Sequence, residues 1–231
     1  MKKLATLFVL ICLFAFVAPA QTVLLDVDKV DTTYSKFGPN RKHFVHLYFS
    51  YGLIFGKNNE GAKTRVPGSN DFKIGLRYKY KISELLSLGV EANYGNHTFD
   101  FRQEEGKVIV DTTLHDEEEI IMHYLEPTLF LRFNIGERGN SIGRFIDFGA
   151  GLPIRLVASH FTQNELPTGE VQTVTTSRLS YVQSYYAHAF ARIGFNNLAF
   201  FYQYRFTDFF TNAVDYPALP AMTMGIQLGI H

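Results

Sequence analysis

Apolar and polar residues alternate with a period of two along most of the chain after residue 42. Residues 221–231 show the pattern clearly. Met222, Met224, Ile226, Leu228 and Ile230 share one face of an extended chain, while small or polar residues share the other. A period of two predicts a β-strand whose two faces meet different surroundings. A tilted strand of this length can cross a bilayer, which takes about 9–11 residues.

Seven more segments with the same alternation precede this one. A strand at the end of a chain leaves an open edge unless another strand pairs with it. We therefore predict that the last segment pairs with the first, near residue 44. The predicted fold class is all-β, an eight-stranded antiparallel up-and-down transmembrane barrel. Its strands are expected at 43–55, 71–82, 85–99, 120–134, 144–159, 178–195, 198–210 and 221–231.

The connections between these segments alternate in length. Residues 83–84, 136–143 and 196–197 form short connections, whereas the others are longer. Tight turns at one end and larger loops at the other are typical of outer-membrane barrels, and an even strand count leaves both termini on the periplasmic side. Pro127 and Pro153 fall inside the fourth and fifth segments. Each removes a backbone donor, so we expect a bulge or a shifted face there.

The start of the chain has the features of a signal peptide. Two lysines precede an apolar run at 4–17, and Ala18-Pro19-Ala20 provides a small-residue cleavage site. The run is shorter than the roughly 20 residues of a membrane-spanning helix. We predict a cleaved signal peptide at 1–20, a periplasmic lead-in at 21–42 and the barrel at 43–231. The single cysteine, Cys12, lies in the signal peptide, so the mature chain would have no thiol for a disulfide or metal site.

The alternation does not by itself say which face is inside, because a soluble lipocalin-like barrel has the inverted pattern. Volume favours the membrane orientation. The lumen of an eight-stranded barrel is just wide enough for side chains to fill it, so the many bulky apolar residues must point outward. Charged residues then point inward, where burial is costly unless they pair. We predict a plugged lumen with a salt-bridge network of Arg77, Lys79, Glu91, Glu126, Arg132, Asp147, Arg155, Arg192 and Arg205.

Aromatic residues cluster near the ends of the segments. Outer-membrane proteins place such residues in girdles at the two membrane interfaces. We expect this position for Phe55, Phe72, Phe133, Phe145, Phe195, Phe206, Phe209 and Phe210.

The fourth and fifth segments carry a resemblance to a known family. The fourth reads Tyr124-Leu125-Glu126-Pro127-Thr128-Leu129-Phe130-Leu131-Arg132-Phe133, and a glycine-rich strand at Phe145–Gly151 follows it. In these residues the chain resembles the outer-membrane β-barrel families of the Bacteroidota, which group with OmpA/OmpX-like barrels and include PorT-like proteins. The resemblance covers about 43–231. PorT-like proteins are implicated in type IX secretion, so it implies a role in an envelope complex. The chain departs from the usual pattern by ending in Ile230-His231 rather than an aromatic residue.

Composition and motifs give little indication of chemistry. Charged residues make up 19% of the chain, below the roughly 25% usual in soluble domains. The balanced charge does not suggest nucleic-acid binding. The nearest approach to a lipid A deacylase motif is His160-Phe161-Thr162 with Glu165, where threonine replaces the expected serine. The sequence has no zinc spacing and no phosphate-binding glycine loop, so we expect no cofactor, metal site or enzyme activity. The acidic stretch at 100–119 fits either cation or partner binding or a solvated loop.

These patterns predict a non-enzymatic integral protein of the bacterial outer membrane. It would serve envelope integrity or act as a subunit of an outer-membrane secretion or assembly complex. Its expected partners are outer-membrane lipid and lipopolysaccharide, with other envelope proteins as further candidates. Two alternatives remain open at this point: a lipid A-modifying barrel enzyme and a soluble lipocalin-like binding protein.

Overall fold

The computed structural model describes residues 35–136 and 139–230. The predicted signal peptide and residues 21–34 of the predicted lead-in lie outside the described residues. No helix in the described ranges is long and apolar enough to cross a membrane. The strands are β1 (His43–Phe55), β2 (Asn70–Lys81), β3 (Leu86–Asp100), β4 (Glu117–Ile135), β5 (Arg144–Gly151), β6 (Ile154–Glu165), β7 (Val171–Ser177), β8 (His188–Phe195), β9 (Leu198–Arg205) and β10 (Met222–Ile230).

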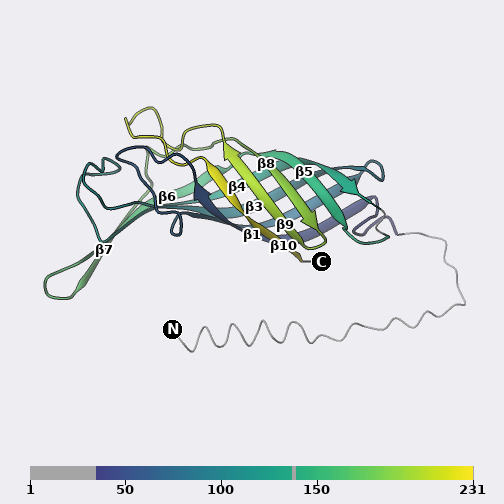
Figure 1. Cartoon of the computed structure of the whole chain (residues 1–231), viewed down its shortest axis with the longest axis horizontal. Coiled ribbons are helices and arrows are strands. Elements are labelled where there is room, and N and C mark those ends of the chain that lie inside the picture. The colour runs from purple at the N-terminus through teal and green to yellow at the C-terminus, as the bar shows by residue number, and fades with distance from the viewer. Residues whose placement is uncertain (1–34, 137–138, 231) are drawn as a thin grey trace, which may run out of the picture. The chain divides into compact units, whose positions relative to one another are not determined.

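Eight of these strands form a closed antiparallel barrel (Figure 1). The ring runs β1-β2-β3-β4-β5-β8-β9-β10, and β10 pairs with β1 to close it. In the closing pair Leu47 lies opposite Ile230 and Phe55 lies opposite Met222. The predicted eight-stranded barrel is therefore confirmed, as is the predicted pairing of the last strand with the first.

The strand β4 pairs with two successive partners on one of its edges. Its second half, from Thr128, pairs with β5, while its first half, up to Leu125, pairs with β6. β5 and β6 are two parts of one path, interrupted at Leu152 and Pro153. Pro153 cannot donate to a ladder, which accounts for the break. Pro127 lies where β4 changes partner, so its missing N–H interrupts neither of these two ladders.

Three predicted strands had bounds that were wrong by five residues or more. The seventh, expected at 198–210, ends at Arg205. The fifth segment, expected at 144–159, is divided between β5 and β6 and continues to Glu165. The sixth, expected at 178–195, is strand only from His188; residues 178–187 are a loop, and β7 precedes them. A long loop was expected between these segments. Instead β6 and β7 form a hairpin that leaves the ring, in which β7 pairs with β6 alone.

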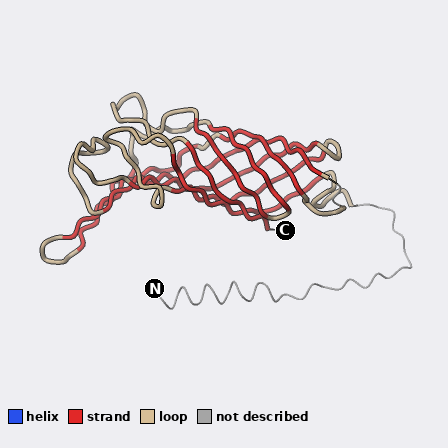
Figure 2. The backbone as a smooth tube through the Cα atoms, in the orientation of Figure 1, coloured by secondary structure: helices blue, strands red, loops and turns tan. Residues whose placement is uncertain are grey.

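The connections differ at the two ends of the barrel (Figure 2). We call the end with residues 56–69, 101–116, 166–170, 178–187 and 206–221 the loop end. We call the end with residues 82–85, 136, 139–143 and 196–197 the turn end. β1 begins and β10 finishes at the turn end. This is the asymmetry expected from the sequence.

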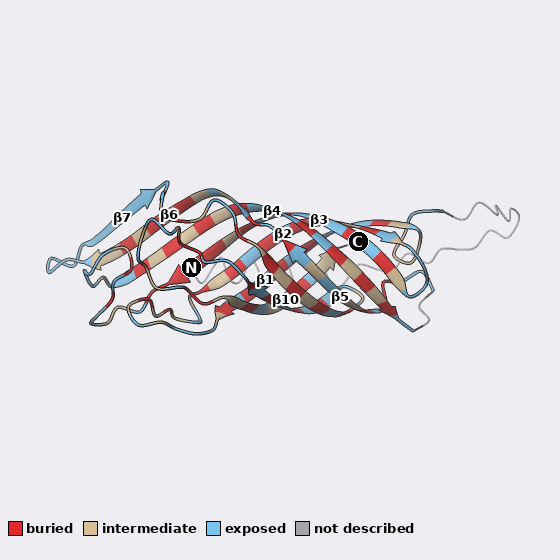
Figure 3. Cartoon of the chain, turned by 90° about the horizontal axis from the view of Figure 1, so that it is seen from above, coloured by how far each residue is buried: buried red, intermediate tan, exposed pale blue. Residues whose placement is uncertain are grey.

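Burial alternates along the strands, as the banding in Figure 3 shows. The inward side chains are polar, charged or aromatic, and the outward ones are mostly apolar and exposed. The lipocalin-like alternative, with apolar residues inside, is therefore wrong. We call the outward apolar surface the belt. Its exposed members include Val45, Leu47, Phe49, Tyr51, Leu53, Phe72, Ile74, Leu76, Tyr80, Leu88, Val90, Tyr94, Leu125, Leu129, Phe148, Ile154, Leu156, Ile193, Phe195, Leu198, Phe200, Tyr202, Tyr204, Met224, Ile226, Leu228 and Ile230.

Three of the eight phenylalanines expected in interfacial girdles are inside the molecule. Phe145, Phe209 and Phe210 are at most 4% exposed. Phe145 is an inward residue of β5, and the other two belong to a loop that folds over the loop end of the barrel. Phe72, Phe195 and Phe206 are exposed.

Inward glycines make room for inward aromatic rings. Each of these glycines is the register partner of an aromatic residue on the next strand, and a Cβ on the glycine would overlap the ring. A barrel this narrow can hold such rings in its lumen because the neighbouring strand has no side chain at that position. The pairs are Gly75 with Tyr48, Gly89 with Phe130, Gly95 with Tyr124, Gly149 with Phe190 and Gly194 with Phe145.

Candidate functional site

The lumen contains a group of buried charged side chains. In the part of the lumen nearest the turn end, these side chains surround Asp147. Arg132 donates to this carboxylate from Nε over 2.7 Å and from Nη2 over 2.9 Å. Arg192 donates to it from Nε over 3.1 Å. All three side chains are at most 1% exposed. One carboxylate thus lies between two guanidinium groups in a buried environment, where charge-assisted hydrogen bonds are strong.

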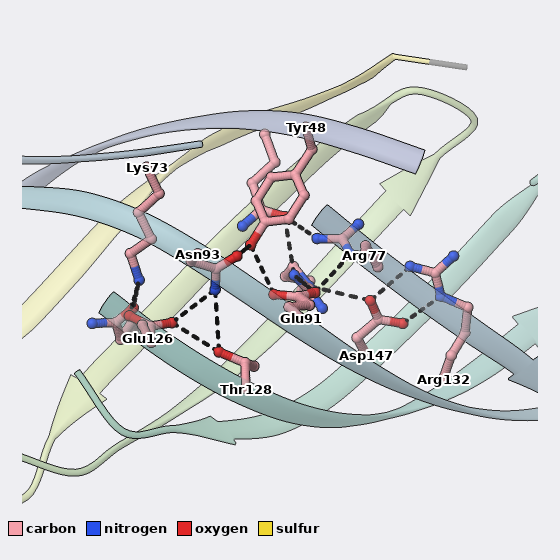
Figure 4. Close-up of polar contacts among 12 residues, drawn as sticks. Tyr48, Lys73, Arg77, Glu91, Asn93, Glu126, Thr128, Arg132 and Asp147 are labelled. Atoms are coloured by element: carbon pink, nitrogen blue, oxygen red, sulfur yellow. Dashed lines mark hydrogen bonds and ion pairs between the residues drawn. The ribbon is translucent and has the colours of Figure 1, made fainter. Parts of the chain in front are cut away.

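Glu91 occupies the middle of the lumen and links its own strand, β3, to β1, β2 and β8 (Figure 4). Its Oε1 lies 2.6 Å from Arg77 Nε and 2.7 Å from Arg192 Nη1. The hydroxyl of Tyr48 lies 2.8 Å from its Oε2. Because Arg192 contacts both Glu91 and Asp147, the two carboxylates belong to one connected network. Gln227 on β10 joins it by accepting from Arg77 over 2.8 Å.

A second carboxylate pair lies closer to the loop end. Lys73 Nζ is 3.0 Å from Glu126 Oε2 and 3.4 Å from Asp71 Oδ2. Asp71 also accepts a hydrogen bond from Tyr124 and lies 3.1 Å from His97 Nδ1. Glu126 accepts a further bond from Asn93, which connects this group to the middle of the lumen (Figure 4).

Six of the nine charged residues selected from the sequence lie together in these groups: Arg77, Glu91, Glu126, Arg132, Asp147 and Arg192. The other three contact backbone carbonyls. Lys79 donates to Pro39, Arg155 to Leu179 and Val182, and Arg205 to Leu219 and Pro220.

The expectation of ion pairs was wrong for Arg155 and Arg205, since neither has a carboxylate within 4 Å among the residues described. Both lie near the loop end, where folded-over loops present carbonyl oxygens. The guanidinium of Arg205 also lies 5.5 Å from the ring centre of Phe209 and 5.8 Å from that of Phe99. Carbonyl dipoles and aromatic faces thus take the place of a counter-ion.

Several lumen residues were not selected from the sequence: Tyr48, Asp71, Lys73, Asn93, His97, Gln203 and Gln227. Asp71 and Lys73 alternate in phase with Arg77, so the period of β2 contained the signal for both. Tyr48 also lies in the inward phase of β1, but its hydrogen bond to Glu91 on β3 depends on the stagger between strands and could not be found from the period.

Both ends of the lumen are covered by apolar side chains. At the turn end the small cluster consists of Phe44, Ile142, Phe145 and Ala199. At the loop end, loops and strand ends form a larger cluster, which we call the cap. It contains Ile54, Ala62, Phe99, Phe101, Ile109, Ile120, Met122, Tyr124, Ala158, Leu179, Val182, Tyr186, Phe209, Phe210 and Leu219.

The space left between the lumen side chains is small. A cavity beside Lys73, His188 and Arg192 has a volume of about 10 Å³, and another beside Arg77 and Arg132 has about the same. Such a space holds about one water molecule. No cluster of three metal-ligating side chains occurs among the residues described. This geometry is suited to holding strands together rather than to binding a substrate.

The residues nearest to a deacylase motif do not form a catalytic arrangement. His160 is 8% exposed, and its Nε2 lies 2.9 Å from Oε1 of Glu118 rather than beside Glu165. The backbone N–H of Glu165 donates to Asp116, and its side chain is exposed. His160 thus belongs to a contact between β6 and β4.

Glu118 holds a loop of the loop end against the hairpin. Gln103 donates to its Oε2 over 2.8 Å, and Lys107 pairs with the same oxygen. Burial by itself would raise the pKa of this carboxyl group. Hydrogen bonds from His160, Lys107 and Gln103 outweigh that effect and hold the pKa of Glu118 below its ordinary value.

We expect Glu118→Gln to loosen residues 102–116. A hydrogen bond to a charged group contributes about 1.5–3 kcal/mol, so amide exchange there should become at least about tenfold faster at pH 7. Acid should have a similar effect on the unsubstituted chain. Because the pKa of Glu118 is lower in the folded chain than in the unfolded chain, its charged form stabilises the folded loop. This contribution is complete above the unfolded pKa of about 4.3 and is lost as the pH falls through the folded pKa.

Hydrogen-exchange mass spectrometry, corrected for the intrinsic effect of pH, measures both changes. The neighbouring Glu117 is exposed, so Glu117→Gln is the matched control and should leave the loop unchanged. Equal exchange in Glu118→Gln and the unsubstituted chain at pH 7 would show that Glu118 does not hold the loop.

Comparisons with known proteins identify no family. No family model matches the chain, and no curated protein matches it. Among solved structures, it is similar to Ail, the attachment invasion locus protein of Yersinia pestis, crystallised with the heparin analogue sucrose octasulfate. The identity is 13% and the TM-score 0.32, over 80% of this chain and 94% of that one. A likeness at this level carries no argument about function, and the resemblance to PorT-like proteins stays a prediction.

Proposed function

We propose that the chain is a non-enzymatic integral barrel of the bacterial outer membrane. The observation that carries the proposal is the belt. Exposed apolar side chains occur on all eight strands of the closed ring, while the charges lie inside. Soluble monomers rarely expose a contiguous apolar surface of more than a few hundred Å². A closed barrel with an apolar exterior and a polar interior satisfies the demands of a bilayer.

The proposed orientation follows from the two ends of the barrel. Outer-membrane barrels have short periplasmic turns and longer external loops. The turn end would then face the periplasm, with both termini on that side, and the cap and hairpin would face outward. A predicted signal peptide at 1–20 agrees with export.

The filled lumen supports a role that depends on the surface of the barrel rather than on transport through it. We propose that the protein serves envelope integrity or is a subunit of an outer-membrane secretion or assembly complex. Membrane lipid and lipopolysaccharide would contact the belt, and other envelope proteins would contact the hairpin or the loops. The lipid A-modifying alternative has no support in the arrangement around His160.

Four measurements test the proposal. The full chain should fractionate with the outer membrane, require detergent for extraction and migrate faster in a gel before boiling than after it. The lipid A of a deletion strain should have an unchanged mass spectrum. Recovery of the chain as a soluble protein would overturn the outer-membrane assignment, and altered lipid A would overturn the non-enzymatic one.

Affinity purification from native membranes would distinguish the two proposed roles. A stoichiometric envelope protein that stays bound would favour a subunit of a complex. Isolation of the barrel with lipid alone would favour envelope integrity.

A further inference from the structure

An apolar groove with a single cation at one end crosses the belt near the turn end. It spans β4, β5, β8 and β9 and has a volume of about 490 Å³, within the range of about 300–1,000 Å³ typical of small-molecule sites. The register places Ile135, Arg144, Phe195 and Leu198 in one row across these strands. The outermost row of the groove therefore contains a guanidinium group among apolar side chains.

The next rows toward the loop end contain apolar and aromatic side chains and no charged one. Ile146 and Ile193 lie opposite each other, and Phe200 follows on β9. Beyond them Ala191 lies between Phe148 and Tyr202 in the register. The lining of the groove reaches Ile193 and Phe200. Ala191 has the smallest side chain of the next row, so we expect an extended hydrocarbon chain that starts at Arg144 to continue along β8 toward the middle of the belt.

Arg144 differs from the cations of the lumen in its surroundings. It is exposed, and no carboxylate lies within 4 Å of it in the part of the chain that the structure describes. Arg132 and Arg192, by contrast, are buried and paired. A guanidinium that has no carboxylate near it among the described residues and lies beside an apolar groove is complementary to a ligand with an anionic group at one end and a hydrocarbon chain behind it. Guanidinium groups bind phosphate with two parallel hydrogen bonds.

We propose that this groove binds an anionic phospholipid of the periplasmic leaflet. The phosphate group would contact Arg144, and one acyl chain would lie over Ile193 and Ala191. The inference rests on the proposed membrane orientation, which places the turn end at the periplasmic surface. A second groove, of about 420 Å³, lies on β1, β2, β3 and β4 beside Leu76, Tyr94 and Leu125. Its outward lining is apolar and lacks a cation, so it provides an internal control.

The sequence contains no tryptophan, so one introduced tryptophan is a unique fluorescent reporter. Phe200→Trp places it in the Arg144 groove, and Leu76→Trp places it in the control groove. Each full-length variant is reconstituted in vesicles of phosphatidylcholine with increasing brominated phosphatidylglycerol, or with brominated phosphatidylcholine instead. Bromine on the acyl chain quenches a tryptophan that it contacts, and the ratio of the two quenching curves gives the lipid selectivity at that groove.

Phosphatidylglycerol should be preferred about fivefold at the Phe200→Trp reporter, the effect of one interfacial basic residue on an anionic lipid. Adding Arg144→Gln to this reporter should abolish the preference, so that the ratio of the two lipids falls to about one. Adding Arg144→Lys instead should keep part of the preference. The Leu76→Trp reporter should show no preference. Equal selectivity in the two grooves, or selectivity that Arg144→Gln leaves unchanged, would overturn the lipid site while leaving the membrane barrel intact. Absence of quenching at both reporters would overturn the membrane barrel itself.

Discussion

Gly225→Ala is expected to prevent the barrel from closing. Gly225 lies opposite Gly52 in the pair of β10 with β1. A Cβ at this position would overlap the carbonyl oxygen of Tyr51 and lie 2.5 Å from the Cα of Gly52. Both neighbours are backbone atoms of the closing strand, so no side-chain rotation relieves the overlap. Strands β1 and β10 would have to separate locally, with loss of ladder hydrogen bonds and exposure of the lumen.

The folded fraction after dilution from urea into detergent or lipid, read from heat-modifiable migration in a gel, measures this effect. We expect little folded protein, because forcing the strands apart costs more than the roughly 4–5 kcal/mol of an exceptionally harmful substitution. Gly229 lies on the same strand, and the nearest heavy atom to a Cβ there is 3.4 Å away. Gly229→Ala should therefore fold normally. Normal folding of Gly225→Ala would show that the closing pair tolerates a wider separation than the structure has.

Asp147→Asn should destabilise the folded barrel by about 3–5 kcal/mol, the cost of removing one partner of a buried ion pair. Asp147 is fully buried, and it accepts hydrogen bonds from both Arg132 and Arg192. The substitution keeps the shape of the side chain and removes its charge. Arg192 still has Glu91 at 2.7 Å, but Arg132 loses the carboxylate that accepts its hydrogen bonds from Nε and Nη2.

Urea unfolding in detergent or lipid measures the free-energy change. Asp215 is an exposed aspartate of the loop end, so Asp215→Asn should change the stability by no more than about 0.5 kcal/mol. Adding Arg132→Gln to Asp147→Asn removes the unpaired buried cation, and the double variant should lose less than the sum of the two single losses. Strict additivity would indicate that Arg132 and Asp147 do not stabilise each other.

The strands that the sequence predicted best are those with strict alternation and no proline. β1, β2, β3 and β10 start and finish within one residue of the expected bounds. Along the whole length of these strands, one face forms part of the belt and the other lines the lumen, so the period of two is uninterrupted. The closing pair followed from a general requirement, since an unpaired terminal strand has a row of free donors and acceptors.

The hairpin of β6 and β7 could not be found in the same way. β7 reads Val-Gln-Thr-Val-Thr-Thr-Ser, and every residue in it is exposed. Neither face of β7 packs against an apolar surface, so apolar and polar residues do not alternate along it. Its sequence therefore resembles that of a polar loop. The partner change of β4 is likewise a property of the assembled sheet. Pro127 indicated an irregularity in the pairing of this strand, but it did not indicate which strand becomes the new partner.

The charged residues of the lumen were more predictable as a set than as pairs. Inward phase identifies Arg77, Glu91 and Asp147 from the sequence alone. Which carboxylate meets which cation depends on the stagger between strands, and that stagger is visible only in the closed ring. The cap was missed because its apolar residues lie at strand ends and in loops without a regular period, as Phe209 and Phe210 do.

The matching of inward rings to inward glycines constrains how this chain can diverge. Phe130 needs the empty position at Gly89, and Tyr124 needs the one at Gly95. A mutation that enlarges the glycine alone produces an overlap, and one that shrinks the ring alone leaves a hole. We therefore expect such positions to covary in homologous sequences: loss of the aromatic residue on one strand should accompany gain of a side chain on its neighbour. That exchange would preserve the width of the barrel while its sequence drifts.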